Sequence, residues 1–81
     1  MKYIYGAGDR ARDCKLVLSK LNIKVKGYLV SDNIDVDEKQ SVYCIDVVNN
    51  KNEKIVIAVG VNYKKQIVDI LTEKGMLNYF L

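Results

Sequence analysis

A glycine-rich turn near the start of the chain holds the residues with the clearest chemical potential. An apolar stretch, residues 2–5, runs into a Gly-x-Gly-x-x-Ala motif and then into a helical pattern; the motif residues are Gly6, Ala7, Gly8, Asp9, Arg10 and Ala11. In dinucleotide-binding folds the first glycine permits the tight turn, the second lets the backbone approach a pyrophosphate, and the third small residue lets helix and strand pack closely. Free N–H groups and the helix dipole then form an anion site. The motif therefore predicts phosphate binding, with a ligand-free structural turn as the alternative.

Charged residues within and beside the motif have opposite effects on phosphate binding. A carboxylate at Asp9 makes a good helix N-cap, yet it repels an incoming pyrophosphate. Arg10 and Arg12 stand nearby in the sequence, where they either offset that charge or remain solvated. We therefore count Asp9 and Arg10 among the candidate ligand-binding residues, together with the glycines.

Two further turns are expected to lie near the motif. Asp32 follows the second predicted strand, where nucleotide-binding folds place a ribose-binding acid; the alternative is a solvated loop acid. Gly60 follows an apolar run and precedes a second helical pattern, so its turn is expected at the same sheet edge, next to the point where strand order reverses. Asn62 is a natural N-cap there. Lys64 and Lys65 oppose the helix dipole, so they either meet an anion or are merely tolerated in solvent.

Composition excludes several classes of partner. The chain has 81 residues, 49% hydrophobic and 28% charged, with a net charge of +3 that comes almost wholly from scattered lysines. No basic run is long enough to indicate nucleic-acid binding. No run approaches the roughly 20 apolar residues of a membrane span, and the start resembles no signal peptide. We therefore expect a cytoplasmic domain with no membrane span.

The cysteines and the lack of histidine argue against catalysis. Cys14 and Cys44 are thirty residues apart, no Cys-x-x-Cys is present, and the chain contains no histidine. A metal site or a cysteine–histidine nucleophile is therefore not expected, and the commonest general base is missing. Both cysteines are interpreted as small buried hydrophobic residues. No catalytic residue is assigned.

The elements that must position these turns alternate between strand and helix. Strands are predicted at residues 2–5, 24–30, 42–45, 55–59 and 77–81, with helices at 9–21 and 60–74 and a loop at 31–40. Alternation of this kind predicts an α/β fold with right-handed crossovers, in which the strands form a mainly parallel sheet of order 3-2-1-4-5. The chain is therefore expected to form one small Rossmann-like three-layer domain over residues 1–81, complete or cut from something larger.

Local signals refine these elements. Asn22 is expected to end the first helix in the left-handed conformation, Gly75 to end the second, and Asp46 to cap a brief helical turn. Each helix should turn one apolar stripe toward the sheet. The inward residues are Ala11, Cys14, Val17, Leu18 and Leu21 in the first helix and Tyr63, Ile67, Ile70 and Leu71 in the second.

Several segments together carry a resemblance to a known group of domains. They are Tyr5-Gly6-Ala7-Gly8, Gly27-Tyr28-Leu29-Val30-Ser31-Asp32 and Ile57-Ala58-Val59-Gly60-x-Asn62-x-x-Lys65. With them the chain resembles the small N-terminal nucleotide-sugar-binding domain of bacterial sugar acyltransferases, the sialic acid and bacillosamine acetyltransferase type. The closing residues 74–81 are more similar to Rossmann-like modules of glycosyltransferases and methyltransferases in capsule and surface-polysaccharide pathways. The resemblance covers nearly the whole chain and implies a nucleotide-sugar ligand.

The chain departs from the acyltransferase pattern at several positions. The family's loop continues with glycine or histidine and then another glycine, where this chain has Asp9, Arg10 and Ala11. Of the family's acidic pair after the second strand only Asp32 is present, and Lys65 replaces an arginine, which keeps the charge but loses the bidentate fork. The family's catalytic histidine and acetyl-CoA site lie in a following β-helix domain. The resemblance therefore implies no acetyltransferase activity for these residues.

Three hypotheses of function follow. The first is a module that binds a nucleotide or nucleotide-sugar, such as a UDP-sugar, for a transferase domain in cis or in trans. The glycine turn would hold the phosphates, Asp32 would accept from ribose or base, and Asn62 and Lys65 would close the other side. The second is an NAD-binding redox or sensor domain, with Asp32 on the ribose 2′-hydroxyl. The third is a docking or assembly domain with a vestigial nucleotide site. All three leave a homo-oligomer open.

Overall fold

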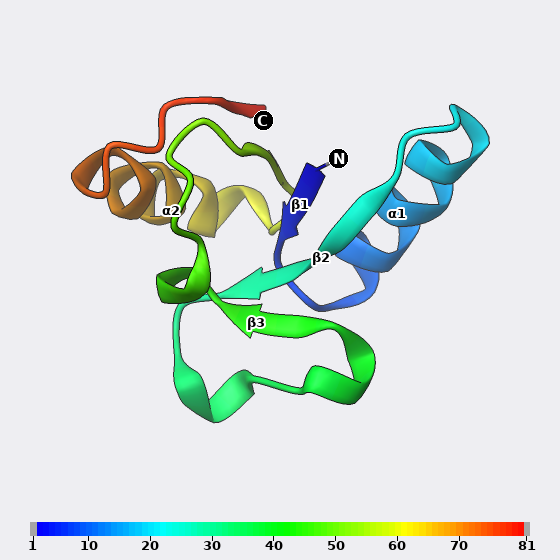
Figure 1. The fold of residues 1–81 in the computed structure, drawn as a ribbon, viewed down its shortest axis with the longest axis horizontal. Helices are drawn as coiled ribbons and strands as arrows, with labels where there is room; N and C mark the ends of the chain where they lie inside the picture. Colours follow the sequence, from blue (N-terminus) through cyan, green and yellow to red (C-terminus); the bar gives the residue numbers. More distant parts are fainter. Residues whose placement is uncertain (1, 81) are drawn as a thin grey trace.

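The central strand of the fold is the one that leads into the glycine motif. In the computed structural model, which describes residues 2–80, five strands form one sheet of order β3-β2-β1-β4-β5, and all neighbouring strands are parallel (Figure 1). The strands are β1 Lys2–Tyr5, β2 Val25–Val30, β3 Val42–Cys44, β4 Lys54–Ile57 and β5 Tyr79–Phe80. The predicted α/β class and strand order are therefore confirmed.

Two helices and three short 3₁₀ turns connect the strands. Helix α1 (Asp9–Lys20) joins β1 to β2, and α2 (Val61–Glu73) joins β4 to β5. The 3₁₀ turns η1 (Asn33–Asp35) and η2 (Glu38–Gln40) join β2 to β3, and η3 (Ile45–Val47) follows β3 directly. Asp46 lies inside η3 rather than capping it, because the capping position falls on Cys44. None of the helices among residues 2–80 is long and apolar enough to cross a bilayer.

Left-handed residues follow both helices, as the sequence predicts. Asn22 has φ 60° and Gly75 has φ 72°, which turn the chain back toward the sheet. The N–H of Ile23 then donates to the Leu18 carbonyl at 2.9 Å, and the N–H of Met76 donates to the Leu71 carbonyl at 2.9 Å. The chain after each helix thus bonds back to a carbonyl of the last helical turn, as is common at helix ends.

A core lies on each face of the sheet, and Figure 1 shows α1 and α2 on opposite sides of it. Beneath α1 lies a small core, and beneath α2 and η3 lies a larger one. The α1-side core comprises Ile4, Ala11, Tyr28 and Val42. The α2-side core comprises Tyr5, Leu29, Cys44, Ile45, Ile55, Ile57, Ile67, Leu71 and Met76. Cys44 is buried as expected, whereas Cys14 is half-buried at the edge of the α1-side core.

Three residues expected to face inward are exposed instead. Tyr63 is 61% exposed, and Val17 and Leu21 are 57% and 63% exposed. Tyr63 lies in the first turn of α2, beyond the point where β4 ends at Ile57, so that no strand lies beneath it. Val17 lies about 120° around α1 from the buried Ala11, and Leu21 follows the last helical residue, Lys20, so neither points into the α1-side core.

Candidate functional site

The glycine motif and the Gly60 turn meet at the carboxyl edge of the sheet. Strands β1 and β4 are neighbours there, and their connections lead to helices on opposite faces. The two turns enclose an open hollow of about 370 Å³, lined by Gly6, Ala7, Gly8, Asp9, Arg10, Ala58, Val59 and Gly60. The structure thus brings six of the nine predicted site residues to one place. It is the crevice where ligands bind in open parallel sheets.

The first glycine of the motif is required by the fold. Gly6 has φ +122°, and a Cβ atom added to it would lie 2.8 Å from the carbonyl oxygen of Ala58 and 3.2 Å from Cγ1 of Val59. Its N–H donates to the Leu29 carbonyl at 2.8 Å. Only glycine fits this backbone conformation without strain. The conformation therefore explains Gly6 without a ligand.

The second glycine has no such internal reason. Gly8 has φ −89° and ψ −163°, which any residue can adopt. A Cβ atom added there would meet nothing within 4 Å. Gly8 lines the hollow, and its bare Cα borders open space.

Both helices begin at the hollow without a side-chain cap. The N-cap residues are Gly8 for α1 and Gly60 for α2, and neither position provides a side-chain hydrogen bond. Asp9 and Asn62, the expected caps, lie instead inside the first turns, because each helix begins earlier than its polar residue. The N–H groups of a first turn lack the usual partner four residues earlier, although in α2 the N–H of Tyr63 donates to the Gly60 carbonyl at 2.9 Å. Two helix starts therefore present backbone N–H groups and positive dipole ends near one hollow.

The charges around these two starts differ. Asp9 and Arg10 both line the hollow at the start of α1, so their formal charges cancel. The first turn of α2 contains no acidic residue and includes the half-buried Lys64. An anion in the hollow would accordingly be repelled by one carboxylate on the α1 side and by none on the α2 side.

The other three predicted residues lie away from the hollow. The Asp32 carboxylate accepts a hydrogen bond from the backbone N–H of Ile34 at 3.1 Å and so caps η1. Asn62 and Lys65 line a separate hollow on the outer surface of α2. The Lys65 ammonium lies 3.9 Å from the Asp69 carboxylate, one helical turn away. Local hydrogen bonding holds Asp32, and the phase of α2 turns Lys65 outward.

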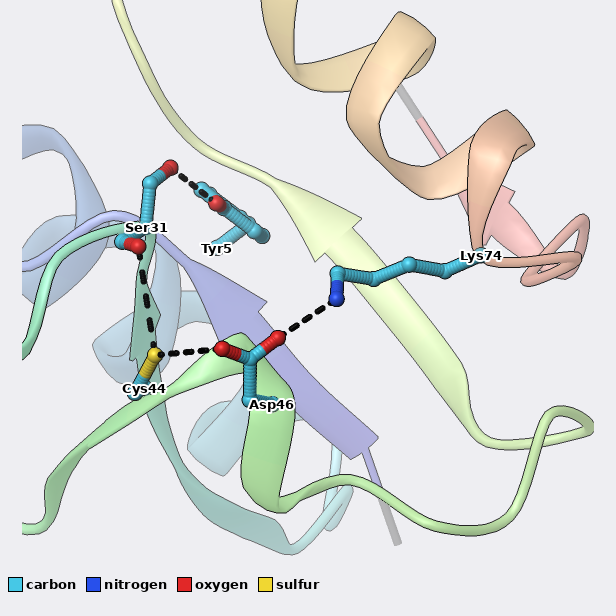
Figure 2. A network of polar contacts seen from close by, with 5 residues as sticks. All are labelled: Tyr5, Ser31, Cys44, Asp46 and Lys74. Atoms are coloured by element: carbon cyan, nitrogen blue, oxygen red, sulfur yellow. Dashed lines mark hydrogen bonds and ion pairs between the residues drawn. The ribbon is translucent and has the colours of Figure 1, made fainter.

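A polar network at the same sheet edge was missed by sequence reasoning. Figure 2 shows it on the α2 side: the Tyr5 and Ser31 hydroxyls share a hydrogen bond, and Lys74 reaches from the end of α2 to donate to Asp46. The Cys44 Sγ lies 3.7 Å from the Asp46 carboxylate and 3.9 Å from the Ser31 carbonyl oxygen, so its single proton can be donated to either. Tyr5, Ser31 and Cys44 stand at or just after the ends of three adjacent strands. That shared position is the signal that could have grouped them.

The network joins elements rather than forming a reactive centre. Burial raises the pKa of Tyr5, against the opposing hydrogen bond from Ser31. The hydrogen bond from Lys74 lowers the pKa of Asp46, and that carboxylate in turn raises the pKa of Lys74. Cys44 is only 3% exposed, so its thiol is closed to a substrate. Among residues 2–80, no three Cys, Asp or Glu side chains group closely enough to hold a metal ion.

The raised pKa of Tyr5 predicts a loss of stability in alkali. Because the folded-state pKa lies above the ordinary value of 10.0, the contribution of Tyr5 is complete below about pH 10 and is lost as pH rises through the folded pKa. Tyr5→Phe should cost about 1 kcal/mol at neutral pH through the lost Ser31 hydrogen bond. Its urea-unfolding free energy should then fall less steeply above pH 10 than that of the native chain. For the control variant Tyr63→Phe, at an exposed position, the unfolding free energy should fall with pH as steeply as for the native chain. Equal slopes for the native chain and both variants would contradict the prediction.

Comparisons of the chain with protein-family models, with curated proteins and with solved structures found no match.

Proposed function

We propose that the domain binds the phosphate groups of a nucleotide or nucleotide-sugar in the hollow between residues 6–10 and 58–60. The single observation that carries the proposal is the bare Cα of Gly8. Its backbone conformation suits any residue, and a Cβ there would touch no other part of the protein. A glycine that the fold does not need, at the mouth of a hollow, is what close approach of a phosphate to the backbone requires.

The electrostatics of the hollow support the same proposal. Backbone N–H groups at two glycine-capped helix starts supply partial positive charge without side chains. Arg10 offsets the charge of Asp9 on the α1 side. A pyrophosphate has two anionic groups, so one can lie toward each helix start. A UDP-sugar or a related nucleotide fits this pattern.

The proposed setting is a transferase of a surface-polysaccharide pathway, acting in cis or in trans. It rests on the resemblance of the first turn, the second strand and the Gly60 turn to nucleotide-sugar-binding domains. The proposal assigns no role to Asp32, because its carboxylate caps η1. That placement favours a UDP-sugar over NADH, which uses an acid at this position for the ribose 2′-hydroxyl. The domain itself is proposed to bind and not to catalyse.

Titration calorimetry with UDP-glucose, CoA and NADH in parallel tests the proposal. We expect heat of binding with UDP-glucose and a weaker response, or none, with NADH. Binding of NADH alone would replace the proposal with the redox or sensor hypothesis. Silence with all three ligands would overturn nucleotide binding and favour a docking domain.

Gly8→Val tests whether the motif makes the contact. The isopropyl group would project into the hollow and block approach to the backbone, so we expect affinity for UDP-glucose to fall at least tenfold. The fold should tolerate the change, at a cost of about 1 kcal/mol for a poor N-cap. Gly8→Ala provides the graded control, with a smaller loss of affinity. Unchanged affinity in a folded Gly8→Val protein would show that the turn does not contact the ligand.

A further inference from the structure

One half of the sheet face beneath α1 is not covered. Helix α1 packs on β1 and β2. In the register of the sheet Ile4 neighbours Val56, and Val56 neighbours Phe80. Ile4 is buried beneath α1, so Val56 and Phe80 point to the same side of the sheet. Among residues 2–80, these two belong to neither core, and Phe80 is 45% exposed.

A flank of α1 borders this uncovered half. Arg10 lines the hollow together with Ala58 and Gly60, so its side of α1 faces β4. Val17 lies seven residues after Arg10, and Leu21 lies four residues after Val17. At these spacings the three side chains lie on the same side of the helix. Both are more than half exposed. We call the resulting surface the open face; its residues are Lys2, Val17, Leu21, Lys54, Val56 and Phe80.

The open face carries two lysines at the amino edge of the sheet. Lys2 and Lys54 are register neighbours, and they share the side of Ile4 and Val56. The Lys2 ammonium lies 4.7 Å from the centre of the Phe80 ring. Neither lysine takes part in the three ion pairs found among the described residues. Adjacent like charges are unfavourable, so this edge is complementary to a negatively charged group.

We propose that the open face binds an amphipathic helix of a partner, lying beside α1 and antiparallel to the strands. All-parallel sheets occur almost only with both faces covered by helices. A helix in that orientation ends at the amino edge, where its negative dipole end and acidic side chains in its last turn meet Lys2 and Lys54. Its apolar stripe covers Val56 and Phe80. The helix comes from a different protein, because the residues of α1 and α2 that are buried, Ala11, Ile67 and Leu71, already pack on their own sheet.

Two hydrocarbon-stapled helical peptides test the proposal. Both carry the same stripe of leucines, and they differ only in the last turn, where one has Glu and the other has Lys. Binding to the ¹⁵N-labelled chain is followed by NMR. We expect the Glu peptide to bind at least tenfold more tightly, with shifts at Leu21, Val56 and Phe80. Equal affinities, or shifts confined to other surfaces, would overturn the proposal.

Matched variants separate a local contact from general attraction to a basic protein. Lys54→Glu should reverse the preference between the peptides, whereas Lys39→Glu, with the same change of charge in η2, should leave it. Phe80→Asp should abolish binding, whereas Ile34→Asp, at a site 87% exposed, should not. Equal effects of the two lysine variants would contradict the proposal. Sedimentation showing that the native chain dimerises and Phe80→Asp does not would assign the face to a second copy instead.

Discussion

Gly6→Ala is expected to lower the free energy of unfolding by about 2–4 kcal/mol, from backbone strain at positive φ together with overpacking. The new methyl group would lie 2.8 Å from the Ala58 carbonyl oxygen, which is backbone and cannot rotate away. Relief would require the ends of β1 and β4 to separate. The two glycines of one motif should therefore respond very differently to the same substitution.

Urea unfolding of Gly6→Ala and Gly8→Ala measures this difference. Gly8→Ala should cost less than about 1 kcal/mol, as expected for an alanine at an N-cap. It should lose affinity for UDP-glucose while remaining folded. Similar losses of stability in the two variants would mean that the open space beside Gly8 is not available in solution. Gly6→Ala with native stability would contradict the close approach of the two turns.

Leu71→Ala is expected to lower the free energy of unfolding by about 2–5 kcal/mol, the range for deletion of a buried leucine side chain. Leu71 is 0% exposed and lies in the α2-side core with Ile67 and Met76. A domain of this size has roughly 4–12 kcal/mol of stability in total. The substitution therefore removes a large share of it.

Denaturant unfolding with Thr72→Ala as the exposed neighbour checks this expectation. Thr72→Ala should change the unfolding free energy by less than about 0.5 kcal/mol. Hydrogen exchange should show faster opening of α2 amides in Leu71→Ala only. Equal small effects in the two variants would indicate that α2 contributes little to the core. The folded fraction of Leu71→Ala should still bind ligand, because Leu71 lies outside the hollow.

The elements that the sequence predicted well are those with strong local signals. Residues 2–5 form a short apolar stretch, and a glycine turn follows it directly. The β-branched run at residues 55–57 is typical of a parallel strand that is covered on both faces. Asn22 and Gly75 tolerate positive φ, so both helix ends were predictable. Because the strands have parallel order 3-2-1-4-5, the turns after β1 and β4 had to meet at one edge.

The residues that were misplaced depend on details that periodicity does not specify. Each residue rotates the direction of a helical side chain by about 100°. The buried Ile67 therefore fixes Lys65 on the outward side of α2, whereas Tyr63 shares the side of Ile67 and is exposed because it lies in the first turn, beyond the end of β4. Asp32 was drawn to a neighbouring N–H, as short acidic side chains commonly are. Two contacts of the network at Tyr5, Tyr5 with Ser31 and Lys74 with Asp46, join residues 26 and 28 positions apart, which periodicity cannot anticipate.

The contact between Gly6 and Ala58 has a further consequence for the kinetics of the hollow. The Ala58 N–H donates to the Tyr5 carbonyl at 3.0 Å, and a Cβ atom on Gly6 would lie 2.8 Å from the Ala58 carbonyl oxygen, so we expect the two turns to move together and not as separate flaps. A ligand would then enter an already formed cradle, and its association would follow a single step whose rate rises linearly with ligand concentration. The proposed binding surface would, in this sense, be a rigid corner of the sheet.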